Sequence, residues 1–174
     1  YRNINNTWTQ IGSDIDGEAA EDRSGRTTIL SSDGTTVAIG ASGNDGNGSD
    51  SGSVRIFKNF NNTWTQVGSD IDGEATGDYS GFDVSLSSEG NIVAIGGIGN
   101  DEWRGRSGHV RIFRNINNTW TQIGSDIDGE AAYDWSGYGV SLSSDGSVVA
   151  IGAYGNDGNG NESGHVRIFR NINN

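Results

Sequence analysis

Runs of apolar residues broken by polar turns recur three times along the chain. The third copy contains four such runs, at 119–123, 138–143, 148–153 and 165–169. The second run alternates apolar with small polar residues, which is typical of a strand with one buried face. The third run is apolar throughout, as expected for a strand buried on both faces. Because no stretch of the sequence has apolar residues at helical spacing, the pattern predicts four strands per copy and essentially no helix.

A fixed period of 56 residues underlies this pattern. The segment 5–20 returns unchanged at 117–132, and nearly unchanged at 61–76. Such a period is the signature of a repeat architecture. Three periods fill the chain and leave a remainder that repeats the opening residues and predicts the start of a further repeat: units 1–56, 57–112 and 113–168, and remainder 169–174. We therefore expect the chain to be a piece of a longer array.

The predicted fold class is all-β. Four antiparallel strands joined by short hairpins, such as the Asp145-Gly146 turn, are typical of a β-propeller blade. Each blade has two apolar faces that its neighbours must cover. Propellers close with about four to eight blades, so three blades need completion by more of the chain or by a second copy, which would make a six-bladed ring. A β-trefoil-like threefold barrel is the alternative, because it also contains three four-stranded repeats.

The sequence resembles a known repeat family. Residues 136–143, Ser-Gly-Tyr-Gly-Val-Ser-Leu-Ser, followed by Val-Ala-Ile-Gly-Ala at 149–153, are similar to the FG-GAP repeat, the blade of integrin α-chain propellers. The match recurs in the second unit and, more loosely, in the first, at 80–86 with 93–97 and at 24–30 with 37–41. The resemblance implies a propeller fold and an extracellular adhesive or structural role.

Two departures from the family limit what the resemblance implies. The proline that follows Gly-Ala in the family is replaced by Ser42, Ile98 and Tyr154. The family's calcium loop, between the first two strands of a blade, is replaced by short Ser-Asp-Gly or Ser-Glu-Gly turns at 32–34, 88–90 and 144–146. These turns are too short to wrap an ion, so the integrin metal sites are not expected in this chain.

Composition and charge narrow the function classes. The 29 glycines, with neither proline nor cysteine, fit a turn-rich β core without disulfides or thiolate metal sites. A formal net charge of −12 argues against nucleic acid as a partner, because binding nucleic acid needs a basic surface. No apolar run reaches the length of a membrane span, so membrane insertion is not expected.

Each copy carries an acidic loop after its Thr-Trp-Thr-Gln strand, with several carboxylates within reach of one another. Calcium takes six to eight oxygen ligands, so this loop is a candidate calcium site, and no other cofactor is expected. The alternative is that the aspartates cap backbone N–H groups in turns. The candidate metal ligands are Asp14, Asp16, Glu18, Asp22, Asp70, Asp72, Glu74, Asp78, Asp126, Asp128, Glu130 and Asp134.

Asparagine sequons recur at one place in every copy. Asn-x-Ser/Thr is an acceptor for N-linked glycan in a secreted protein. It stands before each Trp strand and in two later loops, so the glycosylation candidates are Asn5, Asn61, Asn117, Asn47 and Asn161. A favourable turn sequence in a protein that never meets the glycosylation machinery is the alternative.

Aromatic residues fall into two groups. The repeated tryptophans Trp8, Trp64 and Trp120 are expected to pack between blades. Other aromatics stand where the copies differ, and they are candidates for contact with a glycan or a protein partner, or for packing at blade edges. These are Tyr79, Phe82, Trp103, Tyr133, Trp135 and Tyr138.

No catalytic constellation is evident, so we do not expect an enzyme. The histidines His109 and His165 stand at matching strand starts and belong to the repeat. We expect an acidic, extracellular or cell-surface, structural or adhesive propeller segment within a larger scaffold, filament or ring. Its expected partners are further repeats, a second copy, or a cell-surface protein or glycan. A glycan- or protein-binding lectin-like module, assisted by calcium, is the alternative.

Overall fold

The computed structural model describes residues 1–100 and 105–172. Every regular element in these two ranges is a β-strand. The described residues accordingly include no helix long and apolar enough to cross a membrane. The all-β class predicted from the sequence is confirmed.

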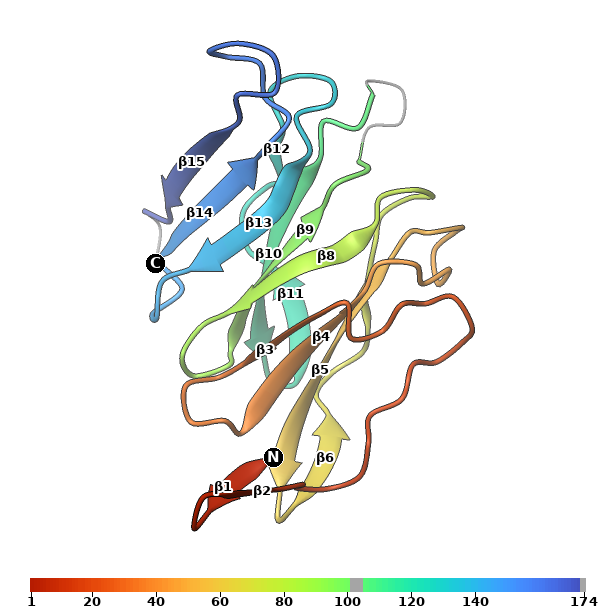
Figure 1. Cartoon of the computed structure of the whole chain (residues 1–174), viewed down its shortest axis with the longest axis vertical. Helices are drawn as coiled ribbons and strands as arrows, with labels where there is room; N and C mark the ends of the chain where they lie inside the picture. Colours follow the sequence, from red (N-terminus) through yellow and green to blue (C-terminus); the bar gives the residue numbers. More distant parts are fainter. Residues whose placement is uncertain (101–104, 173–174) are drawn as a thin grey trace.

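The strands form one hairpin and three antiparallel sheets, which follow one another along the long axis of the molecule (Figure 1). The hairpin pairs β1 (Arg2–Ile4) with β2 (Thr7–Thr9). The first sheet has the order β3 (Thr27–Leu30), β4 (Thr36–Ala41), β5 (Ser53–Phe60) and β6 (Thr63–Gln66), with β7 (Ile71–Asp72) also on β5. The second sheet repeats this order with β8 (Ser80–Leu86), β9 (Ile92–Gly97), β10 (His109–Ile116) and β11 (Thr119–Gln122), with β12 (Ile127–Asp128) on β10. The third sheet contains β13 (Ser136–Leu142), β14 (Val148–Ala153) and β15 (His165–Arg170).

Each complete sheet crosses the boundary between two sequence units. The Trp strand β6 pairs with β5, so that Phe57 lies opposite Gln66, and β11 pairs with β10 in the same register. A Trp strand is thus the outer strand of the preceding sheet, although it opens a new sequence period. The acidic loop, expected to be irregular, also contains the two-residue strands β7 and β12.

The sheets pack face to face, and the hydrophobic core lies between them. Ala38, Val54 and Ile56 of the first sheet contact one face of the second sheet. The opposite face of the second sheet contacts the third through Val149 and Ile151. Every residue of β9 is buried as a result. The β14 strand was expected to be buried on both faces, but only its alternate residues are buried because a neighbouring sheet covers one face.

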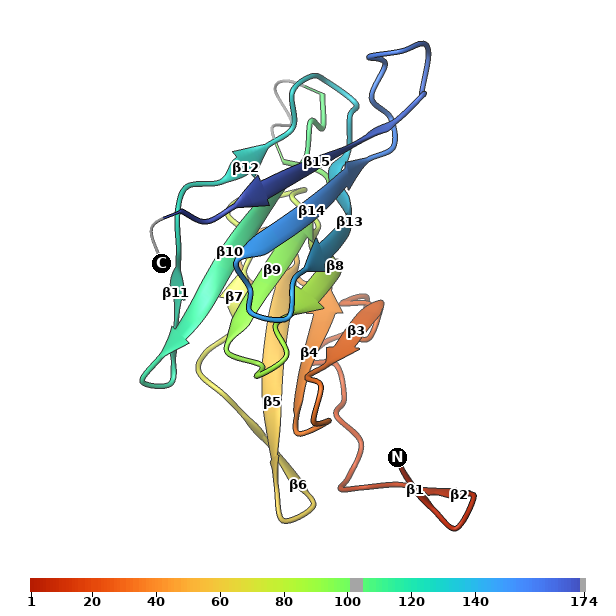
Figure 2. The same cartoon turned by 90° about the vertical axis from the view of Figure 1, so that its left-hand side faces the viewer.

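Hydrogen bonds between sheets fix their relative position. The carboxylate of Asp83 in the second sheet accepts from the Thr27 hydroxyl of the first sheet at 3.2 Å and from the Val140 N–H of the third at 2.7 Å. These contacts link equivalent strands one unit apart. Figure 2 shows the stacked sheets from the side, with the β1–β2 hairpin at one end of the molecule and β15 toward the other.

Candidate functional site

Several carboxylates of the acidic loops hold the loops in shape by accepting backbone N–H groups. Asp22, Asp78 and Asp134 are buried, with 2–4% of each residue exposed. Their carboxylates accept backbone N–H groups of their own loop, as Asp78 does from Glu74 and Ala75, both at 2.8 Å. A carboxylate that accepts a backbone N–H group of its own loop fixes that loop in the way an Asx turn does. In these three residues the structure therefore shows the turn-capping alternative.

The other loop carboxylates engage neighbouring side chains. The glutamine of each Thr-Trp-Thr-Gln segment donates to the first aspartate of the following loop, at 2.6–2.8 Å, in the pairs Gln10–Asp14, Gln66–Asp70 and Gln122–Asp126. The next acidic positions meet an arginine of the third strand of a sheet. Arg111 donates to the carbonyl of Asp72 at 2.6 Å and lies 3.8 Å from a Glu74 oxygen. Equivalent arginines join Asp16 to Glu18 and Asp128 to Glu130, namely Arg55 and Arg167.

Carboxylates of successive units meet at these arginines, and three of them have raised pKa values, chiefly because of burial. Burial raises the pKa of the Glu74 carboxyl above its ordinary value, Arg111 opposes that rise, and repulsion by Asp126 adds to it. Burial also raises the pKa of Glu18, with Asp70 as the next cause. Asp72 has a raised pKa for the same first reason. Carboxylates of successive units thus lie close together, Glu18 near Asp70 and Glu74 near Asp126.

A histidine joins two of these acidic clusters. The Nδ1 atom of His109 lies 3.8 Å from Glu74 and 4.0 Å from Asp126, and Glu130, Asp134 and His165 form a second group. Both groups could hold a cation, and their mixture of imidazole and carboxylate suits a transition metal better than calcium, which prefers oxygen ligands. The neighbouring Arg111 already supplies positive charge to the first group. The first unit has Ser53 at the histidine position.

Glu74→Gln is expected to remove part of the pH dependence of stability. A carboxyl with a raised pKa in the folded state contributes stability that is fully present below its ordinary pKa of 4.5 and is lost as the pH rises through the folded-state pKa. Wild-type protein should therefore lose stability relative to the variant as the pH rises from 4.5. Because Glu74 is partly exposed, we expect a relative change below about 1 kcal/mol. Urea unfolding across this pH range, with EDTA present, measures the difference, and parallel curves for the two proteins would contradict the prediction.

The variable aromatic positions converge on one exposed stripe. The ring of Phe82 lies 5.0 Å from that of Tyr138, which lies 4.5 Å from Tyr154, and Tyr154 stacks on Trp135 at 4.8 Å. The guanidinium of Arg26 lies 3.8 Å above the Phe82 ring. We call these five residues the aromatic stripe. It crosses all three sheets, because Arg26, Phe82 and Tyr138 are equivalent positions one unit apart. They lie at or just before the first strand of each sheet.

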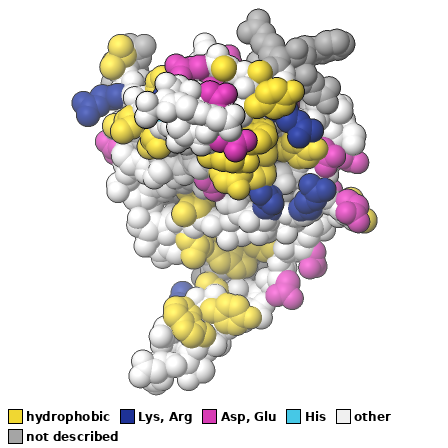
Figure 3. Space-filling view, turned by 45° about the horizontal axis from the view of Figure 1, so that its top comes forward, with side chains coloured by type: hydrophobic (Ala, Val, Ile, Leu, Met, Phe, Trp, Pro, Cys, Tyr) yellow, Lys and Arg dark blue, Asp and Glu magenta, His cyan; other side chains and the backbone are white. Residues whose placement is uncertain are grey.

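Exposure makes the aromatic stripe a candidate contact surface. Tyr138 and Tyr154 are 46% and 48% exposed, and Tyr133, two residues before Trp135, is 62% exposed. Figure 3 shows hydrophobic side chains gathered on one face of the molecule, with Lys and Arg side chains beside them. Tyr133, Trp135 and Tyr79 have positive φ angles of 51–63°, a conformation uncommon for bulky residues. A strained loop backbone thus presents these side chains.

Sequence reasoning found part of this surface. It singled out Tyr79, Phe82, Tyr133, Trp135 and Tyr138, while Trp103 lies outside the described residues. It missed Tyr154 and did not propose Arg26 as a contact residue. The signal for Tyr154 was present, since an aromatic residue stands where the related repeats have proline.

The sequon asparagines lie in two kinds of environment. Asn5, Asn61 and Asn117 are exposed, and each has a positive φ of 49–51° followed by a second asparagine at 63–66°. Two consecutive positive φ angles define the type I′ turn of a two-residue hairpin, which explains the repeated Asn-Asn pair. The side-chain amide of Asn47 instead donates to the carbonyls of Gly73 and Glu74 at 2.9 and 2.8 Å. Asn161 is exposed in a later loop.

Comparison with known proteins supports the fold. A family model described as the FG-GAP repeat matches residues 126–169, which confirms the resemblance over that segment. No curated protein sequence matches the chain. A crystal structure of a proposed 6-phosphogluconolactonase from Bacteroides uniformis ATCC 8492 is similar with a TM-score of 0.55 and 18% identity, over 85% of this chain and 37% of that one. A structure from a study of two prolyl endopeptidases has a TM-score of 0.49 and 13% identity, over 83% of this chain and 20% of that one. The first likeness, at such low identity, bears on the fold alone, which is propeller-like.

Proposed function

We propose, starting from the FG-GAP repeat at residues 126–169, that the chain is a non-catalytic β-propeller segment of three blade units with a structural and adhesive role at the cell surface or outside the cell. Three stacked sheets of one design support the blade assignment. The chain spans 37% of the length of the first similar structure, so the complete ring, its partners and its activity belong to this proposal.

One observation carries the adhesive part of the proposal. Positions that are identical in the copies serve packing, loop capping and ion pairs, as Asp78 and Asp134 do. Positions that differ between the copies form the aromatic stripe, which is solvent-accessible and lies next to arginine. Aromatic and arginine side chains are enriched at the centres of protein interfaces. A repeated scaffold with one differentiated surface is suited to holding a protein partner.

A lectin-like module is the second candidate. The stacked pair Trp135–Tyr154 offers an aromatic face, and the exposed Tyr133 lies on the same loop as Trp135. Aromatic faces of this kind can stack on sugar rings. Calcium assistance would have to come from the acidic clusters beside His109 or His165.

Adhesion of coated beads to cultured cells tests the proposal. Beads carrying the chain should adhere, and Tyr138→Ser or Trp135→Ser beads should lose most of that adhesion. Tyr1→Ser is the matched control, because Tyr1 is an exposed aromatic outside the stripe. Loss of adhesion after protease treatment of the cells supports a protein partner. Loss after glycosidase or EDTA treatment alone favours the lectin-like candidate, and adhesion that is absent or unaffected by stripe variants overturns the proposal.

Expression in a eukaryotic secretory pathway is expected to add glycan at Asn5, Asn61 and Asn117. Their turns are exposed and lie at hairpin tips, so a glycan there displaces no packed side chain. Asn47 should stay unmodified in folded protein, because its amide nitrogen already donates two hydrogen bonds. Mass spectrometry before and after enzymatic deglycosylation counts the occupied sites. Full occupancy at Asn47 with empty hairpin tips would contradict this expectation.

A further inference from the structure

Two of the three repeated tryptophans pack against the preceding unit, each in a site that we call its seat. The indole N–H of Trp120 donates to the carbonyl of Val67 at 2.7 Å, and that of Trp64 donates to the carbonyl of Ile11 at 3.0 Å. A Cβ atom on Gly68 would lie 2.8 Å from the Trp120 ring, so glycine makes room for the indole. Both rings are half-buried, which confirms the predicted packing between units for these two residues.

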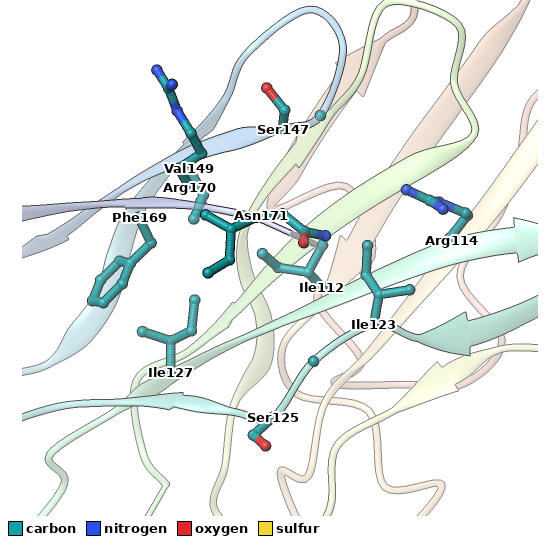
Figure 4. Close-up of a pocket in the computed structure, with 13 residues that line it drawn as sticks. Ile112, Arg114, Ile123, Ser125, Ile127, Ser147, Val149, Phe169, Arg170 and Asn171 are labelled. Carbon is teal, nitrogen blue, oxygen red and sulfur yellow. The ribbon is translucent and has the colours of Figure 1, made fainter. Parts of the chain in front are cut away.

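A third seat of the same kind is open. No described atom lies within 4 Å of a Cβ placed on Gly124, the counterpart of Gly68. A hollow of about 460 Å³ is found there, and Figure 4 shows Ile112, Ile123, Ile127 and Phe169 around it. Gly124 has a φ of 79°, close to the 73° of Gly68, so the backbone of the seat is already formed.

A tryptophan without a seat lies at the other end of the molecule. Trp8 is 67% exposed on the β1–β2 hairpin, whose six strand residues are all exposed. Its hairpin has the same Asn-Asn turn as the two hairpins whose tryptophans are seated. A two-stranded hairpin is marginally stable in water, so it gains most from further pairing.

The sheet faces at the two ends are also complementary. Val166 and Ile168 are 65% and 70% exposed, whereas Val54 and Ile56 at the same positions of the first sheet are buried against the second sheet. On the first sheet, Leu30 is 54% exposed, whereas its counterpart one unit later is buried at the equivalent interface. Each end therefore presents one half of an interface that the molecule already builds twice.

We propose that these two ends bind each other between two copies of the chain, head to tail. Trp8 of one copy enters the hollow at Gly124 of the other, and its indole N–H donates to the Ile123 carbonyl. The open face of the first sheet then covers Val166 and Ile168. This inference makes a second copy of the chain the partner in the scaffold role proposed above. It rests on that proposed function only in taking the stacked sheets as propeller blades. Such a heterologous contact closes a ring or extends a filament.

The strand pairing at the junction follows from the sheets already formed. In them the third strand pairs with the Trp strand so that Phe113 lies opposite Gln122. The same register places Phe169 of one copy opposite Gln10 of the other. Residues 170–172 repeat residues 2–4, so one of these two short segments must give way at the junction. The three residue pairs between β1 and β2 lie in an exposed, marginally stable hairpin. They can therefore open at small cost, so that β2 pairs with β15 of the other copy.

Sedimentation of the 174-residue chain over a range of micromolar concentrations tests the junction. Wild type should associate beyond one chain. Trp8→Ala and Ile168→Asp should each weaken association by roughly thirtyfold or more, as for interface hot spots. At concentrations low enough for the wild type to be monomeric, their melting temperatures should match that of the wild type, because both side chains are exposed. A mixture of the two variants retains one intact head and one intact tail, so it should form a pair of about twice 18.3 kDa.

Three results would overturn the proposal. The first is a wild-type chain that stays monomeric at every concentration. The second is association that neither variant weakens. The third is a mixture that fails to pair, which would indicate a symmetric contact. If a monomeric chain nevertheless binds a peptide of residues 5–12 at Gly124, the seat belongs to a strand supplied within a longer chain and the second copy is excluded.

The same samples separate this inference from the proposed function. Trp135→Ser should remove most of the adhesion and leave the mass of the particle unchanged, because its ring packs on Tyr154 and against Gly155 of its own unit. Tyr138 is not suited to this comparison, because at the junction it would take the place that Phe82 has under Arg26. Ile168→Asp should change the mass and leave adhesion by a single chain intact. If the stripe variant keeps its adhesion, the proposed adhesive function is wrong. If Ile168→Asp keeps the wild-type mass, the head-to-tail junction is wrong.

Discussion

Ile151→Asp is expected to unfold the chain, and Ser141→Asp to leave it folded. Ile151 is 1% exposed and packs with Ala94 and Val110 at the interface between the second and third sheets. A carboxylate at this position would be buried without a partner, which costs at least about 4 kcal/mol, a large part of the typical 5–15 kcal/mol of a folded protein. Ser141 is exposed, so the same charge there should change stability by no more than about 0.5 kcal/mol.

Thermal melting and urea unfolding of both variants check this expectation. The pair is matched because it places the same charge on two neighbouring strands of one sheet, on residues that differ in burial. Equal tolerance of the two substitutions would mean that β14 does not face the second sheet. Loss of the third sheet alone, with the first two still folded, would indicate that the sheets unfold separately.

Gly96→Ala is expected to destabilise the protein by about 1–3 kcal/mol, the cost of overpacking. A Cβ on Gly96 would overlap the carbonyl oxygen of Gly137 in the next sheet, and one on Gly40 would overlap that of Gly81. These are backbone atoms in packed strands, so relief requires the sheets to move apart.

Gly152→Ala is the control for this substitution within the same chain. The nearest atom to a Cβ on Gly152 is 3.6 Å away, an ordinary contact, because no described sheet covers that face. Alanine is favoured over glycine in a strand, so this variant should be neutral or more stable by up to about 1 kcal/mol. Urea unfolding measures both, and a Gly152→Ala protein as unstable as Gly96→Ala would show that the close approach between sheets is not the cause.

The strands were largely predictable from the sequence, because hydrophobic alternation and a fixed period act locally. Residues 148–153, predicted as one strand, are β14. The sheet that receives a Trp strand was less evident, since the pairing of β6 with β5 crosses a sequence period. The burial of β14 was overestimated, because burial on a second face depends on a neighbouring sheet and not on the strand itself.

The candidate sites were predictable only as residue types. Aromatics at variable positions suggested contact, but the meeting of Phe82, Tyr138 and Tyr154 depends on how far each sheet is displaced from the next. The approach of Glu74 to Asp126, 52 residues later, has the same origin. The hairpin tips were the reverse case. The Asn-Asn pair signals a type I′ turn from the sequence alone, because asparagine tolerates positive φ, and a turn was the alternative to a glycosylation site at these positions.

Near-identical tandem units carry a hazard during folding, because a strand can dock one whole unit away from its proper place. Asp83 distinguishes the middle unit from its neighbours, which have Thr27 and Gly139 at that position. Its carboxylate is bound from both sides at once, by a hydroxyl of the preceding sheet and an amide of the following one. A chain that shifted the middle unit to either end would leave one of those bonds unmade. Asp83 therefore favours the correct order of the three units. Replacing the middle unit by a copy of the first or third unit would remove this carboxylate and both of its bonds between sheets.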